Sequence, residues 1–317
     1  MQIARNYEAV FSQGHVEFKR SDFGIDTKTE VVISPEDDTE LRRIRITNKT
    51  QSAKVLDITS YAEVVMAIQA SDEAHPAFSN LFVQTQIIRE HNTIYCTRRP
   101  RSEEERPPWM FHLMHVHGSE VEDVSFETDR MQFIGRGRTL RHPQVMDEDA
   151  LSGKEGSVLD PVMAIRHRIR VKANQTATVD LIYGIADTKE ACENLMFKYQ
   201  DRYLKNRAFE LSWTHSQVLL RQINATESDA QLYNRLAASI IYSNSNLRAD
   251  AAVIQNNYRG QSGLWSHSVS GDLPIVLLHV YEQESVELVK QMVKAHAYWR
   301  LKGLSVDLVI WNEDHGS

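Results

Sequence analysis

The sequence predicts a mainly β protein that continues into an α-helical region. Up to about residue 185, short apolar runs alternate with polar residues at a period of two. After about residue 187 the apolar residues recur at helical spacing instead. Short strands separated by frequent turn signals favour an antiparallel sandwich over a parallel α/β sheet. The roughly twelve strand-like runs exceed one small sandwich, so we expect a large assembly of two sheets.

The strand-like runs follow one another from the N-terminal side. HVEFKR at 15–20 alternates apolar and polar residues, ELRRIRITNKT ends in a turn signal, and VLDITSYAEVVMAI is rich in β-branched residues. The later runs are LFVQTQIIRE, TIYCTRR, MFHLMHVHG, VSFETDRMQFIG, VMAIRHRIRVKA and ATVDLIYGIA. Turn signals such as SPEDD, EHN and KANQT separate them.

Three helices are expected in the second half of the chain. The first covers about 188–222, and its apolar positions are Leu195, Tyr199, Tyr203, Phe209, Trp213 and Leu220. The second opens at Thr226, with Asp229 three residues later as a capping box. Its predicted buried stripe consists of Leu232, Leu236, Ser239 and Ile240. The third spans about 283–301, with Val286, Val289, Val293 and Ala297 on one face and Gly303 as its stop, before a final strand SVDLVIW.

Composition narrows the class of protein. The chain has 317 residues and a net charge of -7, which disfavours a nucleic-acid partner. Its two cysteines, Cys96 and Cys192, lie far apart, so we expect a reducing compartment and no disulfide framework. The first residues lack the apolar core of a signal peptide, and no run approaches the roughly 20 apolar residues of a membrane span. These features predict a cytoplasmic chain without a membrane span.

The stretch GQSGLWSHSVSGDLPIVLL at 260–278 is the strongest candidate for a binding site. Its glycines permit tight turns, and Trp265 offers a flat apolar face that can stack on a sugar ring. The polar side chains that could meet sugar hydroxyls are Gln261, His267, Ser268, Ser270 and Asp272. Of these we predict Gln261, His267, Ser270 and Asp272 as substrate-binding residues together with Trp265. An alternative role for Asp272 is to cap a helix formed by LPIVLL, with Pro274 in its first turn.

Two other groups of residues are candidates for chemical sites. His115 and His117 lie on one face of a predicted strand and could chelate zinc, but the sequence identifies no third ligand. Glu127 and Asp129 share a strand face, as paired carboxylates do in glycoside chemistry, although structural roles explain them better. We therefore predict no metal and no cofactor in this chain.

Several long phrases resemble the cyclic β-1,2-glucan synthases, whose modules are related to glycoside hydrolase family 94. These phrases are AHPAFSNLFVQTQ, CTRRPRSEEERPPWMFHL, FETDRMQFIGRGRTL, LSGKEGSVLDPVMAIR, WTHSQVLLRQINATESDAQLYNRLAASIIY, GQSGLW with SGDLPIVLL, and AHAYWRLKGLSVDLVIWNED. They occur in order from about Asn6 to Asp314. The loop departs from the familiar GLWGYGISGD, because Ser266 and Ser268 stand where that pattern has glycines.

The resemblance implies a β-supersandwich over 1–187, a helical linker over 188–245 and the incomplete start of an (α/α)6 barrel over 246–317. LPIVLL would then form the first barrel helix. The general-acid aspartate of the related phosphorylases lies downstream of the matched phrases, so the resemblance implies no catalytic residue in this chain and a fragment without turnover of its own. The implied partners are a β-glucan oligosaccharide and the barrel of the parent enzyme, which is expected on the cytoplasmic side of the inner membrane.

Three hypotheses remain open at this point. The leading one is a glucan-positioning fragment of a glycosyl-transfer or phosphorolysis enzyme. The second is a non-catalytic carbohydrate-binding or scaffold module. The third is a metal- or polar-ligand-binding sandwich unrelated to sugars, which the helical region after residue 187 disfavours.

Overall fold

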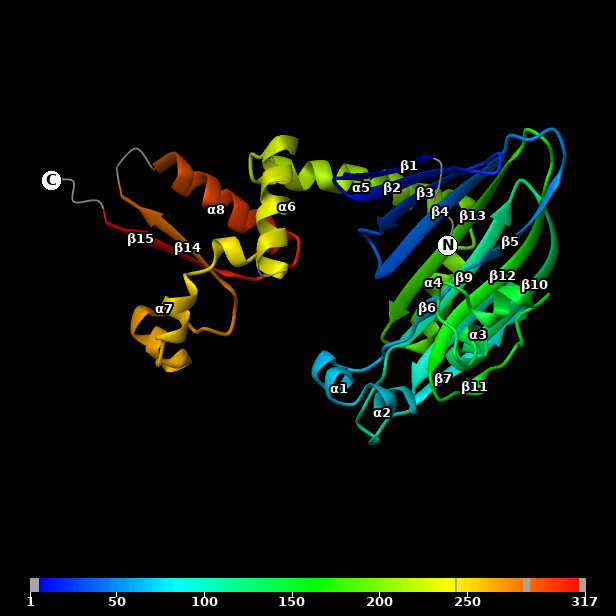
Figure 1. Ribbon diagram of the computed structural model, residues 1–317, viewed down its shortest axis with the longest axis horizontal. Helices are drawn as coiled ribbons and strands as arrows, with labels where there is room; N and C mark the ends of the chain where they lie inside the picture. Colours follow the sequence, from blue (N-terminus) through cyan, green and yellow to red (C-terminus); the bar gives the residue numbers. More distant parts are fainter. Residues whose placement is uncertain (1–5, 243, 282–285, 314–317) are drawn as a thin grey trace. The chain divides into compact units, whose positions relative to one another are not determined.

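The computed structural model describes residues 6–242, 244–281 and 286–313 (Figure 1). These residues form two compact units, Met1–Trp213 and Thr214–Ser317, which we call the first and second units. Helix α5 (Arg202–Gln222) contains the boundary between them. Within the described residues, no helix combines the length and the apolar character that crossing a membrane requires.

The first unit is built on a nine-stranded sheet in which neighbouring strands run antiparallel. In order across the sheet, its strands are β1 (Asn6–Ser12), β2 (His15–Asp22), β3 (Ile25–Ile33), β4 (Thr39–Asn48), β13 (Thr176–Ala186), β9 (Trp109–His117), β8 (Thr93–Arg98), β7 (Val83–Ile88) and β11 (Gly156–Ser157). Strand β13 lies at the centre, where Ile182 pairs with Leu41 on β4 and with Leu113 on β9. All three side chains are buried, which fixes the register of these strands.

A second, four-stranded sheet packs against the inner face of this one. It contains β10 (Glu120–Asp129), β12 (Pro161–Val171) and β5 (Lys54–Thr59), and β6 (Ala62–Glu63) also pairs with β12. Alternate residues of β12, among them Met163, Ile165 and Ile169, enter a core shared with Met114 and Val179 of the larger sheet. This alternation is the period-two pattern of the sequence, and it confirms the predicted two-sheet sandwich.

Helices cover the outer face of the nine-stranded sheet. Helix α4 (Lys189–Lys198) contacts β13 and β9, and it brings Cys192 and Met196 into a core with Phe111 and Ile182. Tyr199, which follows α4, is buried as predicted, whereas Tyr203 is 83% exposed. The helical pattern breaks here because α4 ends at Lys198, before α5 begins. The remaining helices of this unit are α1 (Gln69–Ala74), α2 (Pro76–Asn80), α3 (Arg130–Ile134), η1 (Arg89–His91) and η2 (Gln144–Asp147).

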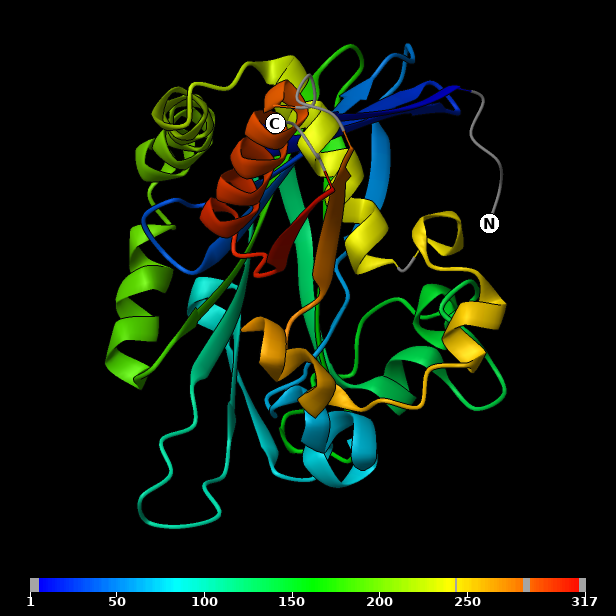
Figure 2. The ribbon, with the colours of Figure 1, turned by 90° about the vertical axis from the view of Figure 1, so that its left-hand side faces the viewer.

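The second unit is a small α/β assembly. Its elements are α6 (Glu227–Ile241), η3 (Ser245–Leu247), α7 (Ala251–Gln255), η4 (Gln261–His267), β14 (Ile275–Val280), α8 (Val286–Leu301) and β15 (Asp307–Asn312). Thr226 and Asp229 form the predicted capping box at the start of α6. Strands β14 and β15 pair in parallel, and α8 connects them and packs beside them (Figure 2).

The helix predicted for LPIVLL was wrong. LPIVLL forms strand β14 rather than a first barrel helix, so Asp272 caps no helix. The reason is pairing: Val276, Leu278 and Val280 turn toward the core at a period of two, while β15 supplies the backbone partners.

The buried faces of α6 and α8 differ in part from the prediction, although Leu236 and Ile240 do pack against the core. Leu232 and Val293 are exposed, while Tyr233 and Trp299 are buried together with Tyr298. The aromatic side chains remove more apolar area from water than the leucine and valine stripes would, so they determine which face turns inward. The domain boundaries and the barrel start implied by the resemblance remain predictions.

Candidate functional site

The candidate site is the loop of the second unit that runs from Gly260 to Asp272, called here the Trp265 loop. It begins as the 3-10 helix η4 and reverses direction at Ser268, whose φ is 60°, and again at Gly271, whose φ is 78°. The Val269 amide donates to the carbonyl of Leu264 at 3.3 Å, which closes the turn. A side chain at Gly271 would come within 2.9 Å of Gln261, so glycine is required there both for its backbone angle and for space.

Polar groups of the loop bind one another. Nε2 of Gln261 donates to the carbonyl of Ser270 and to Oδ1 of Asp272, each at 2.8 Å. Nε1 of Trp265 donates to the same Ser270 carbonyl at 3.3 Å. The Asp272 amide donates to Oγ of Ser270 at 3.3 Å. These bonds join the start of the loop to its end and hold the indole ring in place.

Several groups are left over for a ligand. The Trp265 side chain is 64% exposed, although its N–H is occupied by the loop backbone. Oδ2 of Asp272 and the His267 ring have no hydrogen-bond partner among the described residues, and the hydroxyl of Ser270 remains able to donate. A fixed aromatic ring beside hydroxyl, carboxylate and imidazole groups is a chemistry that suits a sugar.

The structure therefore brings together four of the five predicted binding residues. Gln261, Trp265, Ser270 and Asp272 form one bonded cluster, in which Gln261 serves as a brace. His267 is exposed at the end of η4, and its ring makes no hydrogen bond to that cluster among the described residues. Contact of these residues with a sugar remains a prediction.

Sequence reasoning missed a buried ionic cluster on the outer face of the nine-stranded sheet. Asp180 on β13 accepts from Nε of Arg43 at 2.7 Å and pairs with Nζ of Lys205 on α5 at 3.2 Å. The Lys205 side chain is fully buried, and Arg43 also donates to Asn206 at 2.7 Å. Burial opposes ionisation of Asp180, but its bonds to Arg43 and Lys205 outweigh burial and hold its pKa below the usual value. The sequence feature that could have predicted this cluster is the lone aspartate, Asp180, within the apolar run ATVDLIYGIA.

This cluster accounts for the histidines that resembled a zinc site. The rings of His115 and His117 lie 5.6 Å apart, but Nε2 of His117 is 3.3 Å from Nζ of Lys205. The Lys205 side chain thus lies against one of the two rings, and no group of three or more potential ligands occurs in the described part of the chain.

The carboxylate pair on β10 has structural roles. Oε1 of Glu127 accepts from the backbone amides of Thr128 and Asp129, and Oε2 accepts from Ser152. Asp129 caps α3 through the amides of Met131 and Gln132. Glu127 is fully buried, so neither carboxylate is arranged to protonate a glycosidic oxygen.

Comparison with known proteins agrees with this architecture. Residues 1–202 match the supersandwich domain of glycosyl hydrolase 94. The chain belongs to this family. The matched residues contain both sheets of the sandwich and helix α4, so we call the first unit the supersandwich.

Two relatives extend the comparison. The chain is 31% identical over 304 residues to the cyclic β-(1,2)-glucan synthase NdvB of Rhizobium meliloti, a match that covers 96% of this chain and 11% of the relative. It is 21% identical to the solabiose phosphorylase of Paenibacillus borealis, over 61% of this chain and 24% of the relative. The chain thus spans less than a quarter of the length of either protein.

Solved structures give a weaker comparison. A bacterial glucoamylase in complex with acarbose covers 70% of this chain and 31% of its own, at 8% identity and a TM-score of 0.40. A putative kojibiose phosphorylase from the human microbiome gives a TM-score of 0.37 at 7% identity, over 65% of this chain and 23% of its own.

Proposed function

We propose that this chain is a glucan-positioning module of a larger carbohydrate-active enzyme that resembles cyclic β-1,2-glucan synthase. The observation that carries the proposal is the exposed Trp265 ring on a loop braced by its own side chains. A ring that is already fixed loses little conformational freedom when a sugar stacks on it, which favours binding. The supersandwich family and the two relatives support the substrate class.

In this proposal a β-glucan strand lies across the Trp265 ring. The Ser270 hydroxyl and Oδ2 of Asp272 bind sugar hydroxyls beside the ring, and His267 contacts the next sugar unit along the strand. The chain positions the glucan, while a neighbouring part of the parent enzyme protonates and cleaves the bond. The parent enzyme is expected at the cytoplasmic side of the inner membrane.

Glucan binding is measured first, by calorimetric titration of the whole chain with linear β-1,2-gluco-oligosaccharides and with cello-oligosaccharides. We expect binding of the β-1,2-linked series, weakened at least tenfold by Trp265→Ala. Trp311→Ala is the matched control, because Trp311 is 53% exposed on β15, outside the loop. Equal binding of both series, or equal loss in both variants, would contradict the proposed subsite.

Turnover is measured separately. The purified chain should release no glucose 1-phosphate from β-1,2-glucan with phosphate and should not change the length of the oligosaccharides, since the described carboxylate pair is held in structural bonds. Turnover that persists after removal of contaminants by a second chromatographic step would show that the chain contains a catalytic group.

A scaffold role is the second candidate, and one observation favours it. The side-chain amide of Gln261 donates its hydrogen bonds within the loop, and the indole N–H of Trp265 also donates to the loop backbone. These groups then shape the loop instead of a ligand site. A folded chain that binds neither oligosaccharide series in the titration would establish this role.

A further inference from the structure

Among the described residues, strand β1 forms one edge of the nine-stranded sheet and pairs on one side only, with β2. All seven of its residues are exposed. An edge strand presents unpaired N–H and C=O groups that another strand can bind, and proteins normally guard such edges with charges, prolines, bulges or short length.

The other edges of the supersandwich are guarded and β1 is not. Strand β11, at the opposite end of the large sheet, has only two residues. Strand β10 carries acidic residues at 120, 122 and 123, and its register shifts twice against β12. Strand β5 begins with a lysine, Lys54. Strand β1, with the sequence NYEAVFS, contains no lysine, arginine or proline, and it pairs with β2 without a register shift.

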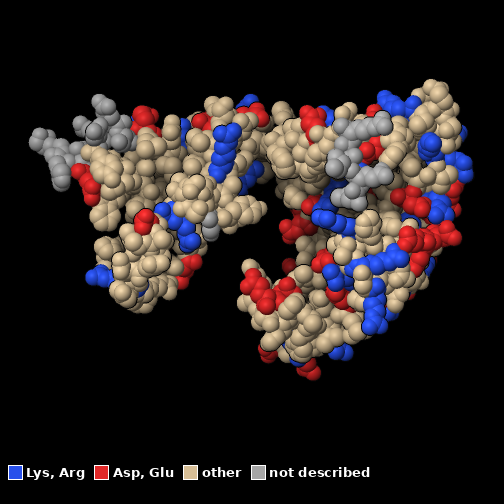
Figure 3. All heavy atoms as spheres, viewed as in Figure 1, with Lys and Arg blue, Asp and Glu red and all other residues tan. Residues whose placement is uncertain are grey.

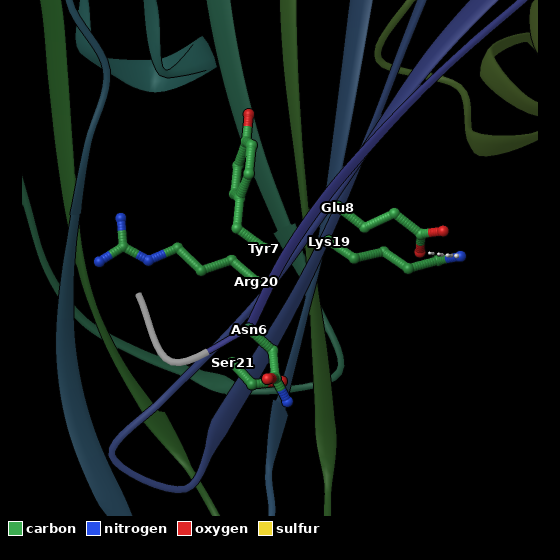
Figure 4. Close-up of a pocket in the computed structure, with 6 residues that line it drawn as sticks. All are labelled: Asn6, Tyr7, Glu8, Lys19, Arg20 and Ser21. Atoms are coloured by element: carbon green, nitrogen blue, oxygen red, sulfur yellow. Dashed lines mark hydrogen bonds and ion pairs between the residues drawn. The ribbon is translucent and has the colours of Figure 1, made fainter. Parts of the chain in front are cut away.

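The two faces of β1 differ in character. Tyr7, Ala9 and Phe11 alternate onto one face, and the Tyr7 and Phe11 side chains are 64% and 73% exposed. Figure 4 shows Tyr7 and Arg20 on this side and Glu8 with Lys19 on the other. Glu8 accepts from Nζ of Lys19 at 3.2 Å, so its charge is balanced within the chain. Tyr7 and Phe11 therefore form an apolar border along an open strand edge.

The backbone of the same three residues faces outward. The turn between β1 and β2 has two residues, so Ser12 and His15 beside it exchange backbone hydrogen bonds. In an antiparallel ladder this exchange recurs at every second residue. The N–H and C=O groups of Tyr7, Ala9 and Phe11 consequently point away from β2 and are open to a partner.

We propose that β1 binds β1 of a second copy of this chain in antiparallel register, centred on Ala9. In that register Ala9 lies opposite the same residue of the partner, and Tyr7 lies opposite Phe11. Glu8 lies opposite Val10, so the two Glu8 carboxylates do not face each other, and each keeps its own Lys19. The outward backbone groups meet in matching pairs, and two aromatic cross-strand pairs complete the contact.

The self-complementary register is what identifies a second copy as the partner. A two-fold axis requires each residue to meet its symmetry counterpart, and this strand satisfies that condition with aromatic pairs at both ends and no like-charge pair. One strand pair buries less than the roughly 1,200 Å² of a stable complex, so we expect a weak dimer that dissociates on dilution.

A charge-swap experiment on the full chain tests the pairing. Ala9→Lys and Ala9→Glu each place like charges opposite one another in the dimer, and each should weaken self-association about fivefold or more. Mixing the two variants places opposite charges together and should restore a mixed dimer. Ala9→Thr, a neutral residue that suits strands, is the control and should dimerise like the unaltered chain. Sedimentation equilibrium over a concentration series measures the self-association of each variant, of the mixture and of the unaltered chain.

The outcomes separate pairing from misfolding. Ala9 is exposed, and far-UV circular dichroism checks that each variant is folded. A chain that stays monomeric at every concentration, or a dimer that Ala9→Lys leaves unchanged, would overturn the proposal. Loss of the dimer in both variants without recovery on mixing would overturn the register centred on Ala9.

Discussion

The supersandwich and the second unit solve the problem of covering a sheet in different ways. In the supersandwich, two antiparallel sheets cover each other, and helix α4 covers part of the outer face. In the second unit, the parallel pair β14 and β15 has α8 on one face, while Ile275, Leu277 and Trp311 remain exposed. Parallel strands are normally buried on both faces, so the second unit depends more on each contact that it makes.

Charge follows the same division. On the face drawn in Figure 3, lysine, arginine, aspartate and glutamate are interspersed over the supersandwich, whereas the second unit is mostly uncharged. Strands β9, β12 and β13 are largely buried, whereas β14 and β15 each keep exposed residues. We therefore expect hydrogen exchange to be slowest in β9, β12 and β13 and faster throughout β14 and β15.

Removing the Asp180 carboxylate should destabilise the supersandwich most. Asp180→Ala leaves Arg43 and the fully buried Lys205 without their counter-charge, a change that costs about 3–5 kcal/mol in comparable buried pairs. Urea unfolding monitored by circular dichroism measures the loss. The control is Asp57→Ala, which breaks the half-exposed pair with Arg168 and should cost at most about 1 kcal/mol. Equal losses would show that the buried cluster contributes no more stability than the half-exposed pair.

Truncating Trp299 should destabilise the second unit while leaving the supersandwich intact. Trp299 is buried against Tyr233 and Tyr298, and its N–H donates to the Tyr233 carbonyl at 2.9 Å. Trp299→Ala should cost about 3–5 kcal/mol, as truncation of buried aromatic residues does. Hydrogen exchange read by mass spectrometry should rise in α6, α8 and β14 and stay unchanged in β12.

Trp265→Ala is the matched tryptophan variant. Its ring is exposed, so its removal should change stability by less than about 0.5 kcal/mol. A rise in exchange within β12 for Trp299→Ala would mean that the two units unfold together, and the contrast between them would be lost.

Acid should destabilise the supersandwich through buried histidines. Burial lowers the pKa of His112 to about 3 and the pKa values of His115 and His167 to about 4. In the unfolded chain these histidines have pKa values near 6.5, so below that pH the unfolded chain binds more protons than the folded chain. The contribution of these histidines to stability is therefore complete above pH 6.5. It falls toward pH 4 by about 1.4 kcal/mol per pH unit for each histidine.

His167→Leu isolates this effect. Both ring nitrogens of His167 are buried without a partner among the described residues, so replacement by leucine forfeits no hydrogen bond. Urea unfolding between pH 7 and pH 4.5 should show a shallower loss of stability for the variant. An unchanged slope would mean that His167 is protonated in the folded chain or that acid acts elsewhere.

The smallest effect is expected in the Trp265 loop. Ser268 has a φ of 60°, a region that glycine occupies without strain, so Ser268→Gly should stabilise the second unit by up to about 1 kcal/mol. Ser266 lies within η4 and has no positive φ, so Ser266→Gly should destabilise it by about 0.5–1 kcal/mol. Thermal unfolding compares the two variants, and shifts of the same sign would contradict the backbone argument.

Much of the supersandwich could be predicted from the sequence. The alternation in VMAIRHRIRV predicts one buried face on β12. In the second unit, Thr226 with Asp229 predicts the start of α6. The binding loop could be predicted in part: Trp265 is exposed as expected, but the bond from Gln261 to Asp272 spans eleven positions and follows from the turns at Ser268 and Gly271.

Local pattern therefore determined the strands, the helix cap and the family, because period, capping chemistry and long matching phrases are properties of neighbouring residues. Tertiary structure alone decided that LPIVLL is a strand, since the choice depended on pairing with Asp307–Asn312 beyond an intervening helix. It also decided that Asp180 is paired, because Arg43 and Lys205 reach it from distant parts of the chain. An apolar run or a buried charge acquires its role only when long-range contacts supply its partner.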